Sequence, residues 1–520
     1  MLDRTLQSEM SIYDTLYDFQ KRIVDKFKNR QSFGLFLDMG LGKTPLALAL
    51  AETNNCTKTI VITLNSKALE PITKEGSWLY WASKSSLNYK LFAKSDIPDF
   101  DKQRPELFII NYESLFSRAR TRAKRIELKK NVLNFINACG GHNVAIIVDE
   151  SHKMKNLQSQ QTLAINEIKR MLKFRATSIY TYLLTGTPFT TGYIDLYSQL
   201  KTLGYSETKA SFIDDFCVRG SVPGLLGWQQ PIVGYKNVDK LYDIIHQFAI
   251  TIKSEDVVDL PEKIFVNHSL PVSDDFKIFT QEFAKGSDIM NAYERHGLDI
   301  PALRDIKQPN PFFRNIANPD LKWLAESAGT FYLRCRQLSI GFQGNATESM
   351  WYDRRRLEQL KDFLREYPDN YIIFYNFTPE LLELYDICTE LGYNVDVYCG
   401  EIKSTVFYDN YVASSESEKM INKKNVILAN FASGSTGMNW QAYNKCVIFS
   451  VPLYSHYEQG IKRIHRLGQK ETTIYHIFYQ ENWLDFGMRK SLNDAIEYSQ
   501  KMFESDLARV HEITSDDTSS

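Results

Sequence analysis

Short apolar runs recur along the chain, separated by stretches with helical spacing. A first group of these runs lies at residues 34–37, 59–64, 107–110, 144–148 and 178–184, and a second at 371–375, 395–399, 425–429, 445–449 and 473–478. A short continuous apolar run is typical of a strand that is buried on both faces, as in a parallel sheet. We therefore predict an α/β protein with two doubly wound units, each built on a parallel sheet.

The segment between the two groups has a different character. Residues 206–345 are charged and aromatic-rich, with helix-like spacing and few strand-like runs. We predict a first α/β unit over residues 1–205, a mainly helical insertion over 206–345, and a second α/β unit over 346–500. Residues 501–520 are acidic and rich in Ser and Thr, and we expect a disordered tail.

Composition narrows the class of protein. The hydrophobic fraction of 43% and charged fraction of 24% are those of a globular protein, and the net charge of -1 leaves any polyanion to local patches. The 7 cysteines show no CxxC spacing, which disfavours a disulfide framework and a zinc site and suits a reducing cytoplasm. No run approaches the roughly 18 apolar residues of a membrane span, so we expect a soluble intracellular protein without a membrane partner.

The first chemical signal is a glycine-rich loop between a strand-like run and a helix-like run. Residues 37–44 read LDMGLGKT. Backbone N–H groups of Gly40, Leu41 and Gly42 can surround phosphates, Lys43 can neutralise the β- and γ-phosphates, and Thr44 can ligate Mg²⁺. The pattern predicts a nucleoside triphosphate site, although Leu37 stands where the strict motif has its first glycine.

The second signal is a pair of acids after the buried run 144–148. Asp149 and Glu150 follow that run directly. Phosphoryl transfer requires one carboxylate for magnesium and another for the attacking water, so Asp149 would hold Mg²⁺ and Glu150 would polarise the water.

Several motifs together carry a resemblance. They are the phosphate loop, the Gln20 phrase LYDFQ at 16–20, NYESL at 111–115, DESHKMKN at 149–156, LTGTP at 184–188, DVVDLPEK at 256–263, ASGSTGMNW at 432–440 and QGIKRIHRLGQ at 459–469. In this order and spacing the chain resembles a superfamily 2 DExH helicase-type ATPase of the Swi/Snf-like branch. The resemblance implies two RecA-like lobes with a Swi/Snf-type insertion between them, and it implies ATP and Mg²⁺ as cofactors.

The resemblance also implies nucleotide contacts at both ends of the chain. Gln20 would read the adenine, and Gly437 and Gln459 would lie at the nucleotide. Gln459, Arg463 and Arg466 have the spacing of one helix face, so the two guanidinium groups could act together as arginine fingers on the γ-phosphate.

By the same resemblance, a polynucleotide would contact small polar and basic residues at strand ends. The candidates are Lys67, Asn111, Tyr112, Lys155, Asn156, Asn376, Ser433 and Gly434. Contacts of this kind bind the backbone without reading sequence. The basic run Arg354–Arg356 could add a DNA contact, but we favour a solvated helix face there.

The branch implies an ATP-dependent motor that moves along duplex DNA and remodels DNA or protein–DNA complexes. Two alternatives remain open: a strand-separating DNA or RNA helicase, and a binding scaffold without turnover, which the complete set of catalytic residues disfavours. The compact make-up resembles motors encoded by phages, which predicts a bacterial or phage-infected cytoplasm and partners in replication or recombination. The sequence predicts no oligomeric state.

Overall fold

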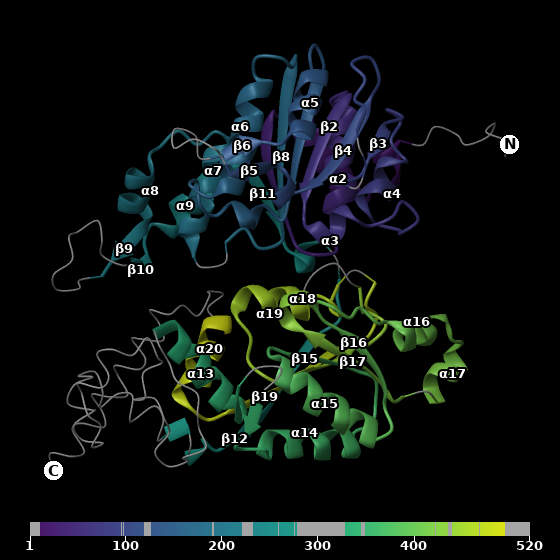
Figure 1. Cartoon of the computed structure of the whole chain (residues 1–520), viewed down its shortest axis with the longest axis vertical. Helices are drawn as coiled ribbons and strands as arrows, with labels where there is room; N and C mark the ends of the chain where they lie inside the picture. The colour runs from purple at the N-terminus through teal and green to yellow at the C-terminus, as the bar shows by residue number, and fades with distance from the viewer. Residues whose placement is uncertain are drawn as a thin grey trace. The chain divides into compact units, whose positions relative to one another are not determined.

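The computed structural model divides the chain into two units, Met1–Asp259 and Leu260–Ser520. It describes residues 11–94, 96, 98–118, 126–189, 192–220, 232–257, 259–274, 276–277, 328–344, 349–421, 423–434, 439–466 and 468–493. Figure 1 shows the first unit in purple to teal and the second mainly in green and yellow. Each unit is built around its own parallel sheet.

The first unit contains a seven-stranded sheet in the order β11-β1-β8-β7-β2-β4-β3, with every neighbouring pair parallel. The strands are β1 (Ser32–Leu37), β2 (Lys58–Thr63), β3 (Lys90–Phe92), β4 (Glu106–Asn111), β7 (Asn143–Asp149), β8 (Ser178–Thr185) and β11 (Ala249–Ile252). Successive side chains alternate between two cores, so that Ile60 and Ile62 pack on one face and Val61 on the other. Burial on both faces explains why these strands are continuous apolar runs.

Helices cover both faces of this sheet. One core includes residues from α1 (Asp18–Phe27), α2 (Lys43–Thr53) and α4 (Trp78–Ala82), and the other includes residues from α5 (Lys130–Ala138), α6 (Gln160–Leu172), α7 (Leu196–Leu203), α8 (Lys209–Phe216) and α9 (Val238–Phe248). The shorter elements are η1 (Ile12–Thr15), α3 (Asn65–Ala68), η2 (Tyr112–Ser114), β5 (Phe116–Arg118), β6 (Ile126–Leu128), η3 (Ser151–Met154), η4 (Tyr193–Asp195), β9 (Cys217–Arg219), β10 (Ile232–Tyr235) and η6 (Ser254–Asp256).

The second unit contains a six-stranded parallel sheet in the order β12-β19-β18-β15-β17-β16. Its strands are β12 (Lys263–Leu270), β15 (Tyr371–Tyr375), β16 (Asn394–Tyr398), β17 (Asn425–Asn430), β18 (Lys445–Ile448) and β19 (Thr473–Gln480). One face packs against α14 (Arg355–Glu366) and α15 (Thr378–Glu390). The other packs against α13 (Ala328–Ile340), α16 (Val406–Ala413), α18 (Phe431–Gly434), α19 (Tyr454–Ile461) and α20 (Trp483–Asn493).

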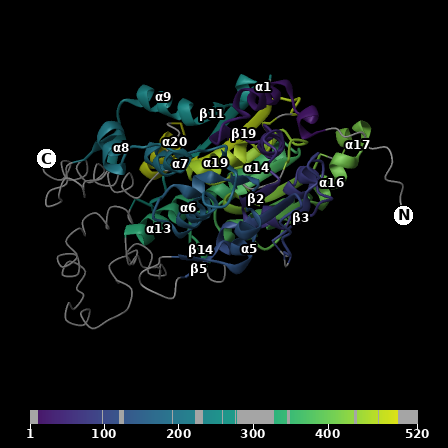
Figure 2. The ribbon, with the colours of Figure 1, turned by 90° about the horizontal axis from the view of Figure 1, so that it is seen from above.

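The described part of the second unit also contains β13 (Phe342–Gly344), β14 (Ser349–Trp351) and α17 (Glu416–Ile421). Figures 1 and 2 both show α16 and α17 side by side. Among the described residues, no helix is both long enough and apolar enough to span a membrane.

All ten predicted strands are present, and the prediction of two RecA-like doubly wound lobes is confirmed. The predicted boundaries at 205/206 and 345/346 need correction, because both sheets extend into the expected insertion. Residues 249–252 form β11 and pair with β1, while residues 263–270 form β12 and pair with β19. Both are edge strands, and β12 is partly exposed and carries polar residues among its apolar ones, so neither gives a continuous apolar run. Residues 278–327 and the predicted tail lie outside the described residues.

Candidate nucleotide site and motor motifs

The phosphate loop lies between the end of β1 and the start of α2. Gly40 and Gly42 have φ angles of 86° and 68°, in the left-handed region that favours glycine. The Lys43 ammonium donates to the carbonyl oxygens of Leu37, at 2.8 Å, and Asp38, at 3.1 Å. Burial lowers the pKa of Lys43 to about 8. The loop therefore places a desolvated cation beside the first turn of a helix, which is the arrangement that binds phosphate.

Gln20 holds this loop from α1. The side chain is buried, and its amide nitrogen donates to the carbonyl oxygen of Leu41 at 2.8 Å while its oxygen accepts from the Tyr17 N–H at 2.9 Å. A Cβ added at Gly42 would clash with the Gln20 amide nitrogen. Both the nitrogen and the oxygen of the Gln20 amide thus form hydrogen bonds with backbone groups. The predicted contact of Gln20 with adenine stays a prediction.

Two hydrogen bonds from a segment distant in the sequence hold the phosphate loop at Asp38. The Asp38 N–H donates to the Ile252 carbonyl at 3.0 Å, and the Ser254 N–H donates to Asp38 Oδ2 at 3.0 Å. Ser254 follows β11, more than 200 residues along the chain from Asp38. No sequence motif indicated this contact, because it depends on the pairing of β11 with β1.

The acidic pair lies at the end of β7, in the centre of the sheet. Asp149 and Glu150 are 2% and 7% exposed. Asp149 Oδ2 accepts hydrogen bonds from Thr63 Oγ1 at 2.8 Å, Trp78 Nε1 at 3.2 Å and Lys67 Nζ at 3.0 Å. The same ammonium donates to Glu150 Oε1 at 3.3 Å. Sequence analysis missed Thr63 and Trp78 in this site.

The charge of the pair is balanced mainly by Lys67. Burial alone would raise the pKa of Glu150, but the nearby positive charges, first of all the Lys67 ammonium, together outweigh burial and lower the pKa to about 2. Burial would lower the pKa of Lys67, but the two carboxylates raise it. The Glu150 carboxylate and the Lys67 ammonium are therefore both charged at neutral pH.

Tyr112 supports the backbone of the two acids. Its side chain is fully buried, and its hydroxyl donates to the Asp149 carbonyl oxygen at 2.7 Å and lies 3.3 Å from the Glu150 carbonyl oxygen. Glu150 has a φ of 55°, which non-glycine residues rarely adopt. The hydroxyl therefore helps to hold a strained backbone at the predicted general base.

The LTGTP segment approaches both parts of the site. His152 Nδ1 lies 3.1 Å from Thr185 Oγ1, which accepts from the Thr187 N–H at 3.1 Å. A Cβ added at Gly186 would lie 3.4 Å from the Leu37 carbonyl oxygen. Burial lowers the pKa of His152, which favours the neutral imidazole. The segment after β8 thus links the acidic pair to the phosphate loop.

The QGIKRIHRLGQ segment of the second unit corrects one prediction. Helix α19 ends at Ile461, so Arg463 and Arg466 lie in the following turns and not with Gln459 on one helix face. Gly468 has a φ of 98°, and Gln469 Nε2 donates to the carbonyl oxygens of Gln441 and Ile464, at 3.0 and 3.1 Å. These contacts fold the segment into a fixed loop, which ends the helix early.

The two arginines of this loop are both withdrawn from solvent. Arg463 is 4% exposed, and its carbonyl oxygen accepts from the Trp440 N–H at 3.1 Å. Burial lowers the pKa of Arg466. His465 Nε2 lies 2.8 Å from the carbonyl oxygen of Pro261, so the DVVDLPEK and HRLGQ phrases meet at the start of β12.

Comparison with known proteins gives the family. A model of the SNF2-related domain matches residues 20–297, which is more than half of the chain. The chain belongs to the SNF2-related family. It is therefore a nucleic-acid-dependent ATPase of the Swi/Snf kind, and an ATP-dependent motor associated with DNA.

No curated protein matches the chain. Among solved structures, the chain is similar to the Sulfolobus solfataricus SWI2/SNF2 ATPase core in complex with dsDNA, with 19% identity over 94% of this chain and 93% of that chain, and a TM-score of 0.36.

The structure of the SNF2-related ATPase corrects two predicted nucleic-acid contacts. Tyr112 is 0% and Asn111 3% exposed, so neither side chain can reach a polynucleotide. Lys67 pairs with the two acids, and its predicted contact with nucleic acid stays a prediction. The reason is topological: β2, β4 and β7 are neighbours and parallel, so residues after β2 and β4 lie at the same edge of the sheet as Asp149. Lys155 and Asn156 are exposed, and their predicted contacts stay predictions.

In the second unit of the ATPase, Asn376 braces two loops. Its side-chain amide nitrogen donates to Ser450 Oγ at 2.7 Å, and its backbone carbonyl oxygen accepts from Asn430 Nδ2 at 3.1 Å. Ser433 and Gly434 are the last two residues of α18, which directly follows β17. Gly437 lies outside the described residues.

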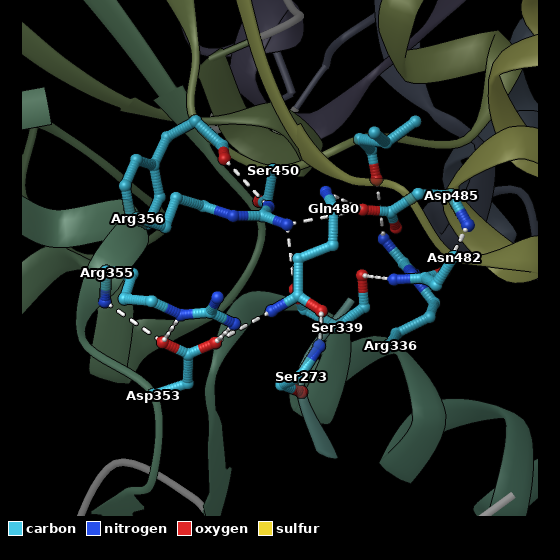
Figure 3. A network of polar contacts seen from close by, with 12 residues as sticks. Ser273, Arg336, Ser339, Asp353, Arg355, Arg356, Ser450, Gln480, Asn482 and Asp485 are labelled. Atoms are coloured by element: carbon cyan, nitrogen blue, oxygen red, sulfur yellow. Dashed lines mark hydrogen bonds and ion pairs between the residues drawn. The ribbon is translucent and has the colours of Figure 1, made fainter. Parts of the chain in front are cut away.

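Arg356 in the second unit is buried, although a charged residue was expected to face solvent. It is 1% exposed and donates to the carbonyl oxygens of Ser339, at 2.7 Å, and Phe449, at 3.1 Å, and pairs with Asp485 at 3.2 Å (Figure 3). The expectation of a solvated face at Arg354–Arg356 is therefore wrong for Arg356. Its position on the apolar side of α14, beside Leu357 and Leu360 in the core, is decided by packing and not by the charge run.

The first unit of the ATPase fits a magnesium ion. Thr44 and Asp149 offer a hydroxyl and a carboxylate, which are the oxygen ligands that Mg²⁺ prefers. Glu150 Oε2 is buried and accepts no hydrogen bond from the residues that the structure describes. That oxygen is thus available to a water molecule, as a general base requires.

Proposed function

We propose that this SNF2-related ATPase couples Mg-ATP hydrolysis to movement along duplex DNA and to the remodelling of DNA or protein–DNA complexes. The observation that carries the proposal is the first unit's site. Lys43 follows β1 and the two acids end or follow β7, while the LTGTP segment at the end of β8 contacts His152, next to the acids, and passes close to Leu37 of the phosphate loop. Strand β8 lies between β1 and β7, so phosphate binding and water activation share one edge of one sheet.

The residues divide the chemistry of hydrolysis among them. Gly40, Leu41 and Gly42 present backbone N–H groups to the phosphates, and Lys43 neutralises their charge. Thr44 and Asp149 hold Mg²⁺, which when bound supplies further neutralisation of the phosphate oxygens. Glu150 Oε2 orients the attacking water, and Arg463 and Arg466 stabilise the charge that develops on the γ-phosphate.

For the polynucleotide, we propose contacts through residues next to these motifs. Lys155 and Asn156 directly follow η3, which begins one residue after Glu150, so a backbone contact there would be joined to the general base by a short segment. Ser433 and Gly434 would contribute from the second unit. Binding of this kind is insensitive to sequence and weakens as salt increases.

The test is ATP hydrolysis by the purified full chain at one salt concentration. Turnover is measured without nucleic acid and then with duplex DNA, single-stranded DNA or RNA, with Lys43→Ala as the inactive control. We expect strong stimulation by duplex DNA, followed by ATP-dependent displacement of a third strand from a DNA triplex. Stimulation by single-stranded DNA or RNA alone would favour a strand-separating helicase, and no turnover with any nucleic acid would contradict the proposal.

A further inference from the structure

Lys67 has a position that the hydrolysis scheme does not use. It lies in α3, directly after β2, and its ammonium is 3.0 Å from Asp149 Oδ2 and 3.3 Å from Glu150 Oε1. The Lys67 side chain is 22% exposed, while the two carboxylate side chains are 3% and 9% exposed. One partly exposed cation thus bridges two buried anions.

No other ammonium among the described residues takes this role. Lys43 Nζ bonds to the carbonyl oxygens of Leu37 and Asp38, and His152 contacts Glu150 Oε2 only at 3.5 Å. Thr63 and Trp78 donate hydrogen bonds to Asp149 but carry no charge. Two buried carboxylates without a counter-ion would be costly, and the ion pairs of Lys67 with both of them make it the counter-ion of the pair.

Magnesium would meet the same two carboxylates. A hydrated Mg²⁺ binds a carboxylate directly or through a bound water that donates a hydrogen bond to it. Asp149 Oδ2 already accepts three donors, one of them the Lys67 ammonium. An ammonium and a divalent cation at one carboxylate repel each other, and in a buried site this repulsion is weakly screened.

We propose that Lys67 is a positioning residue that serves as the counter-ion of Asp149 and Glu150 until Mg²⁺ displaces it. The ammonium keeps both carboxylates in place in the nucleotide-free unit, and its departure makes room for the metal. This inference rests on the proposed use of Mg-ATP at this site. The affinity of the site for Mg²⁺ is then set by competition between the metal ion and Lys67 for the same two carboxylates.

Replacing Lys67 tests the competition without turnover. In Lys67→Met the pair loses its counter-ion, so the melting temperature of the full chain without nucleotide or DNA should fall by roughly 5–10 °C in EDTA. Millimolar MgCl₂ should restore at least half of this loss, whereas the wild type should respond little because Lys67 already neutralises the pair.

Lys169→Met is the matched control. Lys169 belongs to the same unit, and its ammonium donates to Ser32 Oγ at 3.1 Å and to the Thr202 carbonyl oxygen at 2.7 Å. The variant should also lose stability, but MgCl₂ should not restore it. Equal responses of the two variants to MgCl₂ would show that Lys67 is an ordinary structural ion pair and would overturn the proposal.

A second measurement uses binding of a fluorescent ATP analogue at increasing Mg²⁺. The half-saturating Mg²⁺ concentration should fall by about tenfold in Lys67→Met, because the competing cation is absent; an unchanged concentration would refute the competition. If Lys67→Met cannot be purified, Lys67→Gln keeps one donor and carries the same expectation. Neither assay contains DNA or depends on turnover, so failure of the proposed motor function would appear separately, as absent DNA-stimulated hydrolysis.

Discussion

At Glu150 the backbone takes a left-handed conformation, with a φ of 55°, at the residue that the proposed chemistry needs most. Such a conformation persists only where neighbouring groups hold it. Here the Tyr112 hydroxyl bonds to the carbonyl oxygen of Asp149, and the Glu150 N–H donates to Asp149 Oδ1 at 3.1 Å. The direction of the Glu150 side chain therefore depends on a tyrosine that touches no ligand.

Replacing Tyr112 by Phe removes this hydroxyl. We expect the free energy of unfolding to fall by about 1–2 kcal/mol, because two buried carbonyl oxygens lose a donor. The turnover number should fall by about tenfold while the affinity for ATP stays within about twofold, since the general base is displaced and the phosphate loop is not.

The control for Tyr112→Phe is Tyr182→Phe. Tyr182 is also fully buried in the first unit, and its hydroxyl accepts a hydrogen bond from Asn54 Nδ2 at 3.1 Å. This variant should lose similar stability with unchanged turnover. Equal turnover in the two variants, measured by stopped-flow phosphate release, would contradict the positioning role of Tyr112.

Two substitutions test the chemistry itself. Lys43→Ala should abolish turnover because the phosphates lose their cation, and Glu150→Gln should abolish turnover with ATP still bound because the amide cannot polarise water. Steady-state hydrolysis and equilibrium binding of a fluorescent ATP analogue separate the two cases. Hydrolysis at the wild-type rate in either variant would rule out the assigned roles.

At the level of elements, buried polar contacts place the loops at strand ends of the second unit. Glu380 on α15 is 0% exposed and accepts from the Phe377 N–H at 2.9 Å and from Ser450 Oγ at 2.7 Å. Its carboxylate thereby joins the loop after β15 to the loop after β18, where Asn376 also bonds to Ser450. Burial raises the pKa of Glu380 to about 7. The hydrogen bonds from Ser450 and the backbone N–H groups lower this pKa, but by less than burial raises it.

This raised pKa predicts how stability depends on pH. The folded protein binds the Glu380 proton more tightly than the unfolded chain, so the contribution is complete below pH 4.5 and is lost as pH rises through about 7. Chemical denaturation of wild type and Glu380→Gln from acidic to mildly alkaline pH should show the difference between their unfolding free energies change by about 3 kcal/mol. The wild type should lose stability relative to the variant as pH rises, and a constant difference would contradict a neutral buried carboxyl.

On the scale of the whole molecule, the proposed catalytic groups are divided between two units. Lys43, Asp149 and Glu150 belong to the first unit, whereas Arg463 and Arg466 belong to the second. The arrangement suits a motor, because hydrolysis that needs both units can be coupled to their movement. Each unit has its own sheet and cores.

Arg466→Ala tests this division. If Arg466 stabilises the transition state from the second unit, turnover stimulated by DNA should fall at least about 100-fold while the affinity for ATP changes by less than about threefold. Arg365→Ala is the control, because Arg365 is exposed in the same unit and, within the described part of the chain, its ion pair is with the nearby Asp362 at 2.7 Å. A large loss of ATP affinity without a rate defect would rule out the finger role.

The sequence by itself determined the parts of this protein that are local along the chain. The ten strands buried on both faces were predicted because such strands must be continuously apolar, and the phosphate loop and the acidic pair were found because each consists of residues that are neighbours in the sequence. The family also follows from the order of such local motifs.

Only the tertiary structure decided which side chains meet across the sheet edge and which charges are buried. Lys67, Tyr112 and Trp78 lie on three different segments, and they reach Asp149 because parallel strands bring their carboxyl ends together. The edge strands β11 and β12 gave no periodic signal, since half-exposed strands need not be apolar. The burial of Arg356 likewise depends on the carbonyl groups and the carboxylate that the fold places around it, and no pattern of charges along the chain contains that information.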